Sequence, residues 1–521
     1  MWMGIDQGTT GTTCIAYDDK LRPVAEAYRA LDTRYPRPGW VEQEPEDIVR
    51  SVVETVGAVL AAIGGPGRVD AVGVSNQGES VVAIGGPGRV DAVGVSNQGE
   101  SVVAWDAGTG RALGPVLVWS DRRGAETVAR LERAGQAGHV RRETGLRLDA
   151  YFSAAKLAWL LAHDRAVREA AAAGTLRLGT LDTWLAWRLG ERLDGGRTLT
   201  DHSTASRTQL LGLRSGAWEP ELLDLFGVPA AALATVRPSV EPRGALAHLS
   251  WGGALPWTAS LVDQPAALAG HACFERGDVK ATYGTGCFVL VNAGPEPPAP
   301  PDGLLTSIAW SHGRQRVYAF DGGVFTAGTA ITWLRSIGLI AGAEETAPLA
   351  ASVADTGGVR FLPTITGLGA PWWDGDARGA FTGLTAGTTR AHLVRTVLDS
   401  VAFRVRDVLE AVWASGVPRP PALRVDGGLA RNGYLMQRQA DLLGLPVDRG
   451  AHVEATAAGT AAFAAVGAGL LGYGDIRALL PAAERHEPRT SRDERDADYA
   501  GWRDWLRRAR DASTAADTDT V

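Results

Sequence analysis

The chain has few cysteines and methionines, 3 of each among 521 residues, and no apolar run approaches the length of a membrane span. Cys14, Cys273 and Cys287 lack the spacing of metal ligands, and their odd number leaves one thiol over in any disulfide scheme. Such cysteine usage is typical of the reducing cytosol. A charged leader followed by a cleavable apolar stretch is also missing. We therefore expect a cytoplasmic protein that is not inserted in a membrane.

Long basic runs are missing too. The 52 Lys and Arg and 59 Asp and Glu are spread along the chain and give a formal net charge of −7, which argues against a nucleic-acid partner. Hydrophobic residues make up 45% of the sequence, which is ordinary for a globular protein. Because a single hydrophobic core stops growing well below this length, we expect two or more domains.

The first residues predict a β-meander followed by a helix. Strands are expected on both sides of the turn "DQGTTGTT", with a third strand in 23–35. Glu-Pro and apolar residues at helical spacing then predict a helix from Pro45 to about Ala62. A strand, a Gly-Thr-Gly turn and a strand return in "VKATYGTGCFVLVNAG", and further strands and a helix follow. We infer two duplicated halves, 1–273 and 274–521, with a cleft between them and the last ten residues frayed.

Residues 62–82 and 83–103 are identical, letter for letter. Structural repeats drift in sequence while they keep their period, so this identity indicates a recent duplication or an assembly error. Each copy predicts a strand, "VDAVGVSNQ", and a returning strand that begins "ESVVA". Only the second copy continues into further strand and turn signals, so we expect it to form the native hairpin. The first copy would be a looped insertion, which costs little loop entropy.

Two Gly/Thr-rich turns are candidates for phosphate binding. In "IDQGTTGTT", Asp6 ends a strand, Gly8 leaves backbone N–H groups accessible, and Thr9 and Thr10 add hydroxyl donors. A carboxylate beside such a turn can hold Mg²⁺. Alone, this pattern is also that of a plain hairpin, but "TYGTG" at 282–286 repeats it in the second half. The matched pair favours two loops that face the same phosphates.

Two strand-to-helix junctions carry further candidates. "RVDGGLARN" lets a nucleotide approach the backbone at Gly427 and Gly428, before a helix that begins near Asn432, or it is a plain turn. "SLVDQPAAL" ends a strand with Asp263 and Gln264. The carboxylate of Asp263 could take a proton from a substrate hydroxyl, as the base in phosphoryl transfer does, or it could cap the helix.

Glu100, Trp119 and Tyr151 could shape a small polar pocket, although a single tryptophan or tyrosine is more often part of a core. From about Gly4 to about Trp505, the motifs resemble, in order, those of the glycerol kinases and their close relatives among the FGGY carbohydrate kinases: "IDQGTT", "YPRPGWVEQEPEDI", "TGLRLDAYFSAAK", "STASRTQL", "VDQPAAL", "TYGTGCF" and "RVDGGLARNGYLMQ". The resemblance implies an α/β, two-domain actin-like (RNase H-like) ATPase fold. Mg·ATP would be held mainly by the C-terminal half and the polyol by the N-terminal half.

The implied activity is that of an ATP-dependent polyol kinase. It would convert glycerol and ATP to glycerol 3-phosphate and ADP, or act on a slightly longer sugar alcohol. Asp263 is the implied catalytic base, and Asp6 and Asp263 are the implied Mg²⁺-associated carboxylates. The implied polyol-binding residues are Glu100, Trp119, Tyr151, Asp263 and Gln264. The implied ATP-binding residues are Gly8, Thr9, Thr10, Gly284, Thr285, Gly328, Thr332, Gly427, Gly428 and Asn432. A homo-oligomer, dimer or tetramer, is the remaining partner considered.

Three departures from the family pattern leave other hypotheses open. Gly99 stands where the family usually has an arginine that binds glycerol hydroxyls, so a charged donor is lost and space opens for a longer polyol. Thr13 replaces a basic residue of the first phosphate loop, and "WGGALPW" replaces an effector loop for a sugar bisphosphate. Glu79 and Glu100 become alternative occupants of one pocket position. An inactive polyol- or nucleotide-binding sensor is the second hypothesis, and an actin- or chaperone-like ATPase with a protein partner is the third.

Overall fold

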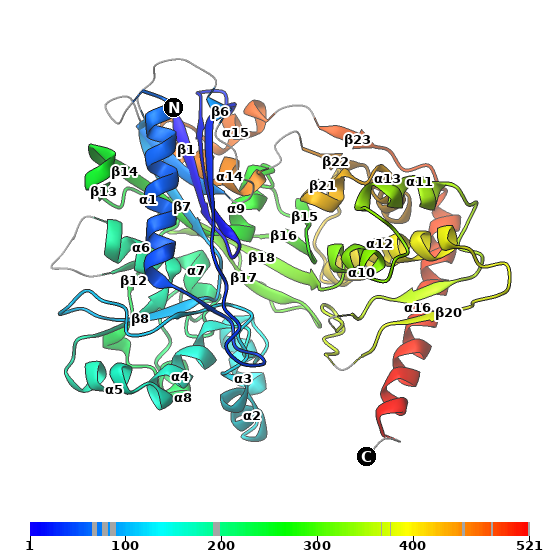
Figure 1. Cartoon of the computed structure of the whole chain (residues 1–521), viewed down its shortest axis with the longest axis horizontal. Helices are drawn as coiled ribbons and strands as arrows, with labels where there is room; N and C mark the ends of the chain where they lie inside the picture. Colours follow the sequence, from blue (N-terminus) through cyan, green and yellow to red (C-terminus); the bar gives the residue numbers. More distant parts are fainter. Residues whose placement is uncertain are drawn as a thin grey trace.

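The computed structural model shows two lobes, each built on a large mixed sheet (Figure 1). The described residues are 1–64, 70–75, 82–83, 90–190, 198–365, 367–375, 377–450, 454–480 and 483–518. Within them, no helix is both long and apolar enough to span a bilayer. The two-lobed α/β architecture expected from the sequence is confirmed.

An eight-stranded sheet forms the centre of the N-terminal lobe, in the order β13-β14-β7-β1-β5-β2-β3-β6. Its strands are β1 (Trp2–Gln7), β2 (Gly11–Tyr17), β3 (Pro23–Ala30), β5 (Asp70–Ser75), β6 (Val82–Ala83), β7 (Val90–Asn97), β13 (Ala245–His248) and β14 (Gly253–Val262). The first three strands are antiparallel, which confirms the meander. Strand β7 is parallel to both β1 and β14. The carboxyl ends of these parallel strands therefore meet at one edge, where Asp6, Asn97 and Val262 lie.

A second, four-stranded sheet, β10-β8-β9-β4, and most of the helices complete this lobe. The strands outside the main sheet are β4 (Glu42–Gln43), β8 (Val102–Asp106), β9 (Val116–Leu117), β10 (Leu176–Thr180), β11 (Leu199–Asp201) and β12 (Thr235–Arg237). The helices are α1 (Pro45–Ala62), α2 (Ala125–Arg133), α3 (Ala137–Thr144), α4 (Ser153–His163), α5 (Arg165–Ala172), α6 (Leu181–Leu189), α7 (His202–Ser206), α8 (Pro220–Phe226) and α9 (Asp263–Gly270), with 3₁₀ turns η2 (Ala230–Ala232) and η3 (Leu249–Trp251). Helix α1 has the predicted bounds, because Pro45 starts it and its apolar face is buried against the sheet.

The C-terminal lobe has a seven-stranded sheet in the order β17-β18-β16-β15-β21-β22-β23. Its strands are β15 (Val279–Tyr283), β16 (Cys287–Gly294), β17 (Leu305–His312), β18 (Gln315–Val324), β21 (Leu423–Asp426), β22 (Val447–Arg449) and β23 (Glu484–His486); a separate pair is β19 (Arg360–Leu362) and β20 (Ala380–Thr382). The helices are α10 (Gly328–Ser336), α11 (Thr346–Ala351), α12 (Arg390–Ala414), α13 (Gly433–Leu443), α14 (Ala455–Gly467), α15 (Tyr473–Leu479) and α16 (Arg492–Thr518), with 3₁₀ turns η4 (Ala343–Glu345) and η5 (Gly428–Arg431). The backbone of α16 continues into the ten residues expected to fray, and 519–521 lie outside the described residues.

Helix α14 crosses back to the other lobe, because it packs on α9 and on the strands of the N-terminal sheet (Figure 1). Two glycines allow the close approach of the helices. A Cβ atom on Gly459 would lie 2.0 Å from the carbonyl oxygen of Ala266, and one on Gly270 would lie 1.9 Å from that of Ala455. Helix α14, which follows β22 of the C-terminal sheet, thus covers the N-terminal sheet near the strand that carries Asp6.

The duplicated segment does not form the expected hairpin. The second copy gives β7 in the main sheet, but the returning strand β8 pairs with β9 and β10 in the other sheet, so the prediction of a hairpin is wrong. The backbone of the first copy contributes β5 to the main sheet, and β6 spans the junction of the two copies, so the first copy is not simply a looped insertion. Glu79 lies outside the described residues. Glu100, in the connection from β7 to β8, therefore takes the pocket position among the described residues.

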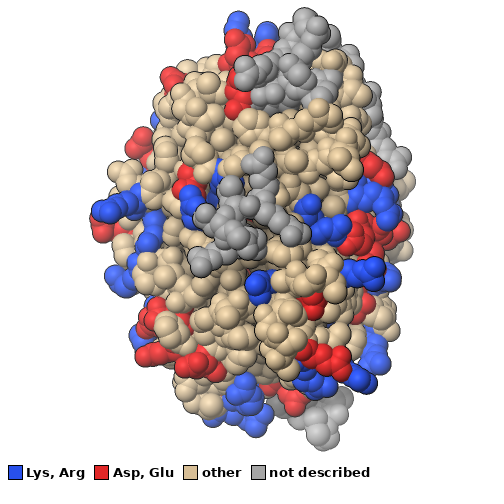
Figure 2. Space-filling model, turned by 90° about the vertical axis from the view of Figure 1, so that its left-hand side faces the viewer, with Lys and Arg blue, Asp and Glu red and all other residues tan. Residues whose placement is uncertain are grey.

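Charges of both signs are intermingled on the face of the N-terminal lobe shown in Figure 2. Helix α1 contributes such pairs: Asp47 bonds Arg50 at 2.7 Å, and Glu46 pairs with Arg188 of α6. Exposed pairs of this kind contribute little to stability. Their mixture means that this face presents no broad patch of a single sign.

Candidate active site

A cavity of about 150 Å³ lies between the lobes at the carboxyl edge of the N-terminal sheet. It is lined by Thr9, Gln98, Gly99, Glu100, Trp119, Tyr151, Arg207, Val262, Asp263, Gln264, Pro265, Phe288, Leu290, Ser307 and Asp321. All the residues predicted to bind a polyol are in this set. They come from segments as distant as the β7–β8 connection and the start of α9, so the fold brings them together.

Glu100 is held in an unusual backbone conformation. Its φ is +60°, in the left-handed region that non-glycine residues rarely adopt, and its side chain is buried. The Ser153 hydroxyl donates to its carbonyl oxygen at 3.2 Å, and Arg207 Nε donates to its Oε1 at 2.5 Å. Burial raises the pKa of this carboxyl, while the charge of Arg207 lowers it. Strain of this kind persists only where the surroundings impose it, and it is common at functional sites.

Two aromatic rings form one wall of the cavity. Trp119 and Tyr151 have ring centroids 5.4 Å apart. The indole Nε1 of Trp119 donates to Thr9 Oγ1 at 2.9 Å, which ties this wall to the first Gly/Thr turn. The buried Lys156 ammonium donates to the carbonyl of Tyr151 at 2.5 Å and fixes the backbone behind the ring. The wall presents apolar ring faces beside polar groups, as small-molecule sites usually do.

Asp263 is the first residue of α9, and Val262 occupies the N-cap position, where no side chain caps the helix. The alternative that Asp263 is the helix N-cap is therefore wrong. Its Oδ1 accepts a hydrogen bond from the backbone N–H of Gln264 at 2.6 Å. Burial raises the pKa of Asp263, and the charges of Lys280 and Arg207 oppose that rise. The site thus holds a carboxyl group at a helix N-terminus with cations close enough to favour its ionised form.

Asp6 is the penultimate residue of β1 and lies in the same region. Burial is the main cause that raises the pKa of Asp6, followed by the negative charges of Asp263 and Glu454; the Ser96 hydroxyl bonds its Oδ1 at 3.2 Å. Among the described residues there is no cluster of three or more His, Cys, Asp or Glu side chains arranged to hold a metal. The donor set fits Mg²⁺, which is usually bound by one or two carboxylates together with substrate phosphates and water.

Backbone hydrogen bonds fix the conformation of both predicted phosphate-binding turns. In the first turn, Gly8 N–H donates to Gly11 C=O at 3.0 Å. In the second, Gly328 N–H donates to Gly284 C=O at 3.0 Å, so the start of α10 packs on the 284–286 turn. A Cβ atom on Gly328 would lie 2.6 Å from that carbonyl oxygen. Gly284, Thr285 and Gly328 are thus brought together, while Thr332 is exposed on the next turn of α10.

The third nucleotide-binding candidate is the junction between β21 and α13, where most of the contacts are made within the protein. Gly427 has a φ of +88°, and a Cβ atom there would lie 2.6 Å from the carbonyl oxygen of Tyr283. Asn432 caps α13 by accepting from Leu435 N–H at 3.0 Å, and its amide donates to Thr346 Oγ1 at 2.9 Å. Nothing obstructs a Cβ atom at Gly428 within 4 Å. This junction therefore has open space at Gly428, whereas Gly427 and Asn432 are fixed by their contacts within the protein.

Several residues of the cavity were missed by the sequence reasoning. Arg207, Phe288 and Asp321 line it, and Lys280 supports it by donating to Gln264 Oε1 and, at 2.8 Å, to Thr282 Oγ1. The only signal for Arg207 was a single charged residue among the small residues of "STASRTQL". The space expected beside Gly99 is not open, because a Cβ atom there would lie 2.8 Å from Cγ2 of Val262.

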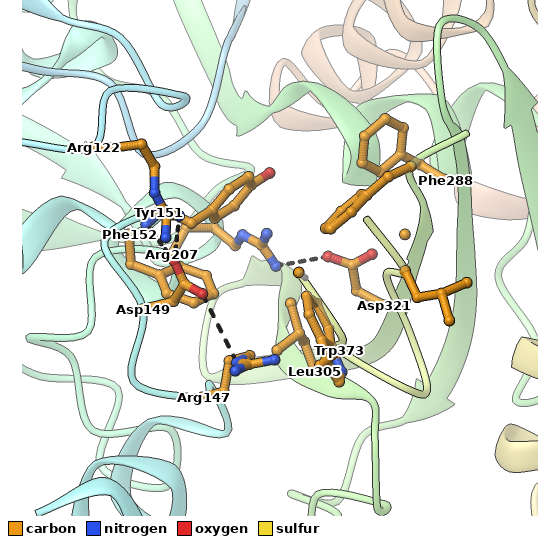
Figure 3. A pocket seen from close by; sticks show the side chains of 14 residues that line it. Arg122, Arg147, Asp149, Tyr151, Phe152, Arg207, Phe288, Leu305, Asp321 and Trp373 are labelled. Atoms are coloured by element: carbon orange, nitrogen blue, oxygen red, sulfur yellow. Dashed lines mark hydrogen bonds and ion pairs between the residues drawn. The ribbon is translucent and has the colours of Figure 1, made fainter. Parts of the chain in front are cut away.

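A second chamber of about 380 Å³ adjoins this cavity, and the two share Tyr151, Arg207, Phe288 and Asp321. Figure 3 shows Arg122 and Arg147 on the N-terminal side of this chamber, and Leu305 and Trp373 beside Asp321. Asp149 bonds Arg122 at 2.8 Å. The smaller cavity therefore adjoins a larger space with a charged margin.

Comparison with known proteins shows matches over the whole chain. The N-terminal domain of the FGGY family of carbohydrate kinases matches residues 1–90 and 85–270, two pieces that overlap within the duplicated segment, and the C-terminal domain matches 279–468. The glycerol kinase of Thermus brockianus is 43% identical over 510 residues, and that of Rhodospirillum centenum is 42% identical over 512 residues; each alignment covers 98% of both chains.

Solved structures of carbohydrate kinases are similar to this chain over nearly its whole length. The glycerol kinase of Plasmodium falciparum with ADP has a TM-score of 0.88 at 26% identity and covers 97% of each chain. The ligand-bound xylulose kinase of Lactobacillus acidophilus has a TM-score of 0.84 at 20% identity, with 100% of this chain and 99% of that one covered, which shows the fold alone.

Proposed function

Because the chain belongs to the FGGY family of carbohydrate kinases, we propose that it transfers the γ-phosphoryl group of ATP to a primary hydroxyl of glycerol or of a slightly longer polyol. The observation that carries this proposal is that Glu100, Trp119, Tyr151, Asp263 and Gln264 line one small cavity between the lobes. The named glycerol kinases that match this chain over 98% of its length support the choice of polyol.

The cavity offers the groups that a polyol requires. The carboxylate of Glu100 accepts hydrogen bonds from hydroxyl groups, and the rings of Trp119 and Tyr151 pack against the C–H groups of the carbon chain. The amide of Gln264 can donate or accept, and its Oε1 is oriented by Lys280. A volume of about 150 Å³ suits a molecule of three or four carbons.

Asp263 is the proposed catalytic base. Its carboxylate takes the proton of the attacking hydroxyl as the bond from that oxygen to the γ-phosphorus forms and the bond to the β-phosphate oxygen breaks. Burial raises the pKa of Asp263, and the positive charges of Lys280 and Arg207 act against that rise and favour the carboxylate. Partial enclosure between the lobes limits the access of water, which is a competing acceptor.

The Gly/Thr turns are the proposed binding sites for ATP phosphates. The N–H groups of Gly8, Gly284 and Gly328 bond within the protein, so these glycines serve by letting phosphates approach the backbone. The hydroxyls of Thr9, Thr10 and Thr285 donate to phosphate oxygens, and Thr332, Gly427, Gly428 and Asn432 lie along the nucleoside. Asp6 and Asp263 would hold Mg²⁺, which neutralises the phosphate charge when it is bound. We also propose a cytoplasmic location, which fits the three buried free thiols.

The test is ADP release from ATP over a panel of polyols, for the wild type and Asp263→Asn. The variant keeps the shape of the side chain but removes the base, so kcat is expected to fall by about 10²- to 10⁴-fold while ATP binding is retained. Asp47→Asn, at a partly exposed position of α1 outside the cavity lining, is the control and should leave kcat unchanged. No ADP release with any polyol would favour the sensor hypothesis, and release that ignores added polyol would favour a partner-driven ATPase.

A further inference from the structure

Arg207 lies between two carboxylates that belong to different lobes. Its Nε donates to Glu100 Oε1 at 2.5 Å, and its NH1 donates to Asp321 Oδ2 at 2.8 Å. The three side chains are only 8%, 5% and 11% exposed, in the order Arg207, Glu100, Asp321. Arg207 follows α7 in the N-terminal lobe, whereas Asp321 is on β18 of the C-terminal sheet. Figure 3 shows the guanidinium pointing across the gap toward Asp321.

This arrangement uses the planar fork of an arginine. Different edges of the guanidinium serve the two carboxylates, so its position relative to Glu100 depends on where Asp321 holds it. The rings of Tyr151 and Phe152, 5.9 and 5.5 Å from the guanidinium carbon, limit its other movements. The charges of Glu100 and Asp321 raise the pKa of Arg207 despite its burial, so the guanidinium stays protonated between them. Buried pairs of this kind are costly to break from one side.

Glu100 needs such an external restraint. Its left-handed backbone, with φ at +60°, is not the conformation that the residue would adopt on its own. One side-chain oxygen is fixed by Arg207, which sets the direction of the carboxylate within the cavity. A polyol hydroxyl bound by Glu100 is therefore positioned by a chain of contacts that ends in the C-terminal lobe.

We propose that Asp321 is a positioning residue, which acts through Arg207 to orient Glu100 and so couples the polyol site to the lobe that binds ATP. This inference rests on the proposed function. It makes the approach of the two lobes a condition for a correctly formed polyol site, because Glu100 is held correctly only when Asp321 is in reach of Arg207. Asp321 would not take part in the transfer of the phosphoryl group.

The test compares steady-state kinetics of Asp321→Asn and Asp321→Glu with the wild type, with the concentrations of polyol and ATP varied separately. Asp321→Asn removes the charge that holds Arg207, so the KM for polyol is expected to rise about tenfold or more while the KM for ATP stays unchanged. Asp321→Glu keeps the charge and should restore most of the polyol KM. Arg207→Lys, which keeps the charge but loses the fork, should also raise the polyol KM.

The matched control is another ion pair between the lobes, Arg141 with Asp302 at 3.6 Å, where Asp302 is fully exposed. Asp302→Asn is expected to change neither KM. An unchanged polyol KM in Asp321→Asn would overturn the inference. The inference would also be overturned if Asp321→Asn changed the KM for polyol and the KM for ATP equally and Asp321→Glu did not reverse these changes, because that result indicates a merely structural role. If the wild type phosphorylates no polyol, the proposed function itself fails.

Discussion

Gly99 lies close to Val262, so we expect substitutions at these two positions to be energetically coupled. A Cβ atom at Gly99 would lie 2.8 Å from Cγ2 of Val262, where ordinary contact begins at 3.4 Å. The φ of Gly99 is outside the left-handed region, so the steric obstacle is the valine and not the backbone. Gly99→Ala therefore forces a shift in the cavity wall, and such overpacking costs about 1–3 kcal/mol.

The same shift should affect catalysis. Val262 precedes Asp263 at the N-cap position of α9, so a displacement of the valine moves the proposed base. A misplacement of about 1 Å can cost about 10²-fold in rate, so kcat of Gly99→Ala should fall by up to that factor. Val262→Ala removes the obstructing methyl groups at a cost of about 1.5–2 kcal/mol in buried apolar surface.

The assay is a double-mutant cycle, measured by urea unfolding and by kcat for Gly99→Ala, Val262→Ala and the double variant. We expect the double variant to be more stable than the sum of the single effects predicts, with a coupling energy of about 0.5–3 kcal/mol. Its kcat should recover relative to Gly99→Ala. Strictly additive losses in both stability and kcat would refute the steric reasoning.

Three other predictions concern residues around the cavity and the duplicated segment. Lys280→Met loses the hydrogen bond to Gln264, so the KM for polyol should rise. Lys280→Arg can still donate to Gln264, so its KM should rise less, and an unchanged KM in Lys280→Met would contradict this role of Lys280. Gly427 has a φ of +88° and lies against a backbone carbonyl, so Gly427→Ala should lower stability by about 1–3 kcal/mol and weaken ATP binding. Gly428 lies in open space, so Gly428→Ala should do neither; calorimetric titration of both variants with ATP tests the difference. Deletion of residues 62–82 leaves one full copy and should preserve polyol-dependent ADP release, and loss of that activity in a folded variant would show that both copies are needed.

Local patterns predicted the local structure well. Helix α1 has the expected bounds because a proline at its first position and an apolar stripe define it within a single segment. The same holds for the Gly-Thr turn between β15 and β16. The residues proposed to bind a polyol were named through the order of family motifs, and all of them line one cavity.

Relations across the chain were not predictable from those patterns. Arg207 and Asp321 are 114 positions apart, and no local signal pairs them. The assignment of β8 to a different sheet from β7 depends on pairing with β10, which alternation of apolar residues cannot specify. Val262 fills the space beside Gly99 only because β14 ends next to the β7–β8 connection.

The central claim is that the cavity between the lobes passes a phosphoryl group to a polyol and not to water. The most direct measurement is ³¹P NMR of the products that the wild type forms from Mg·ATP with glycerol or a four-carbon polyol. The account predicts a phosphate monoester of the polyol and ADP in equal amounts. Equal amounts of ADP and inorganic phosphate, formed at the same rate with and without polyol, would contradict it.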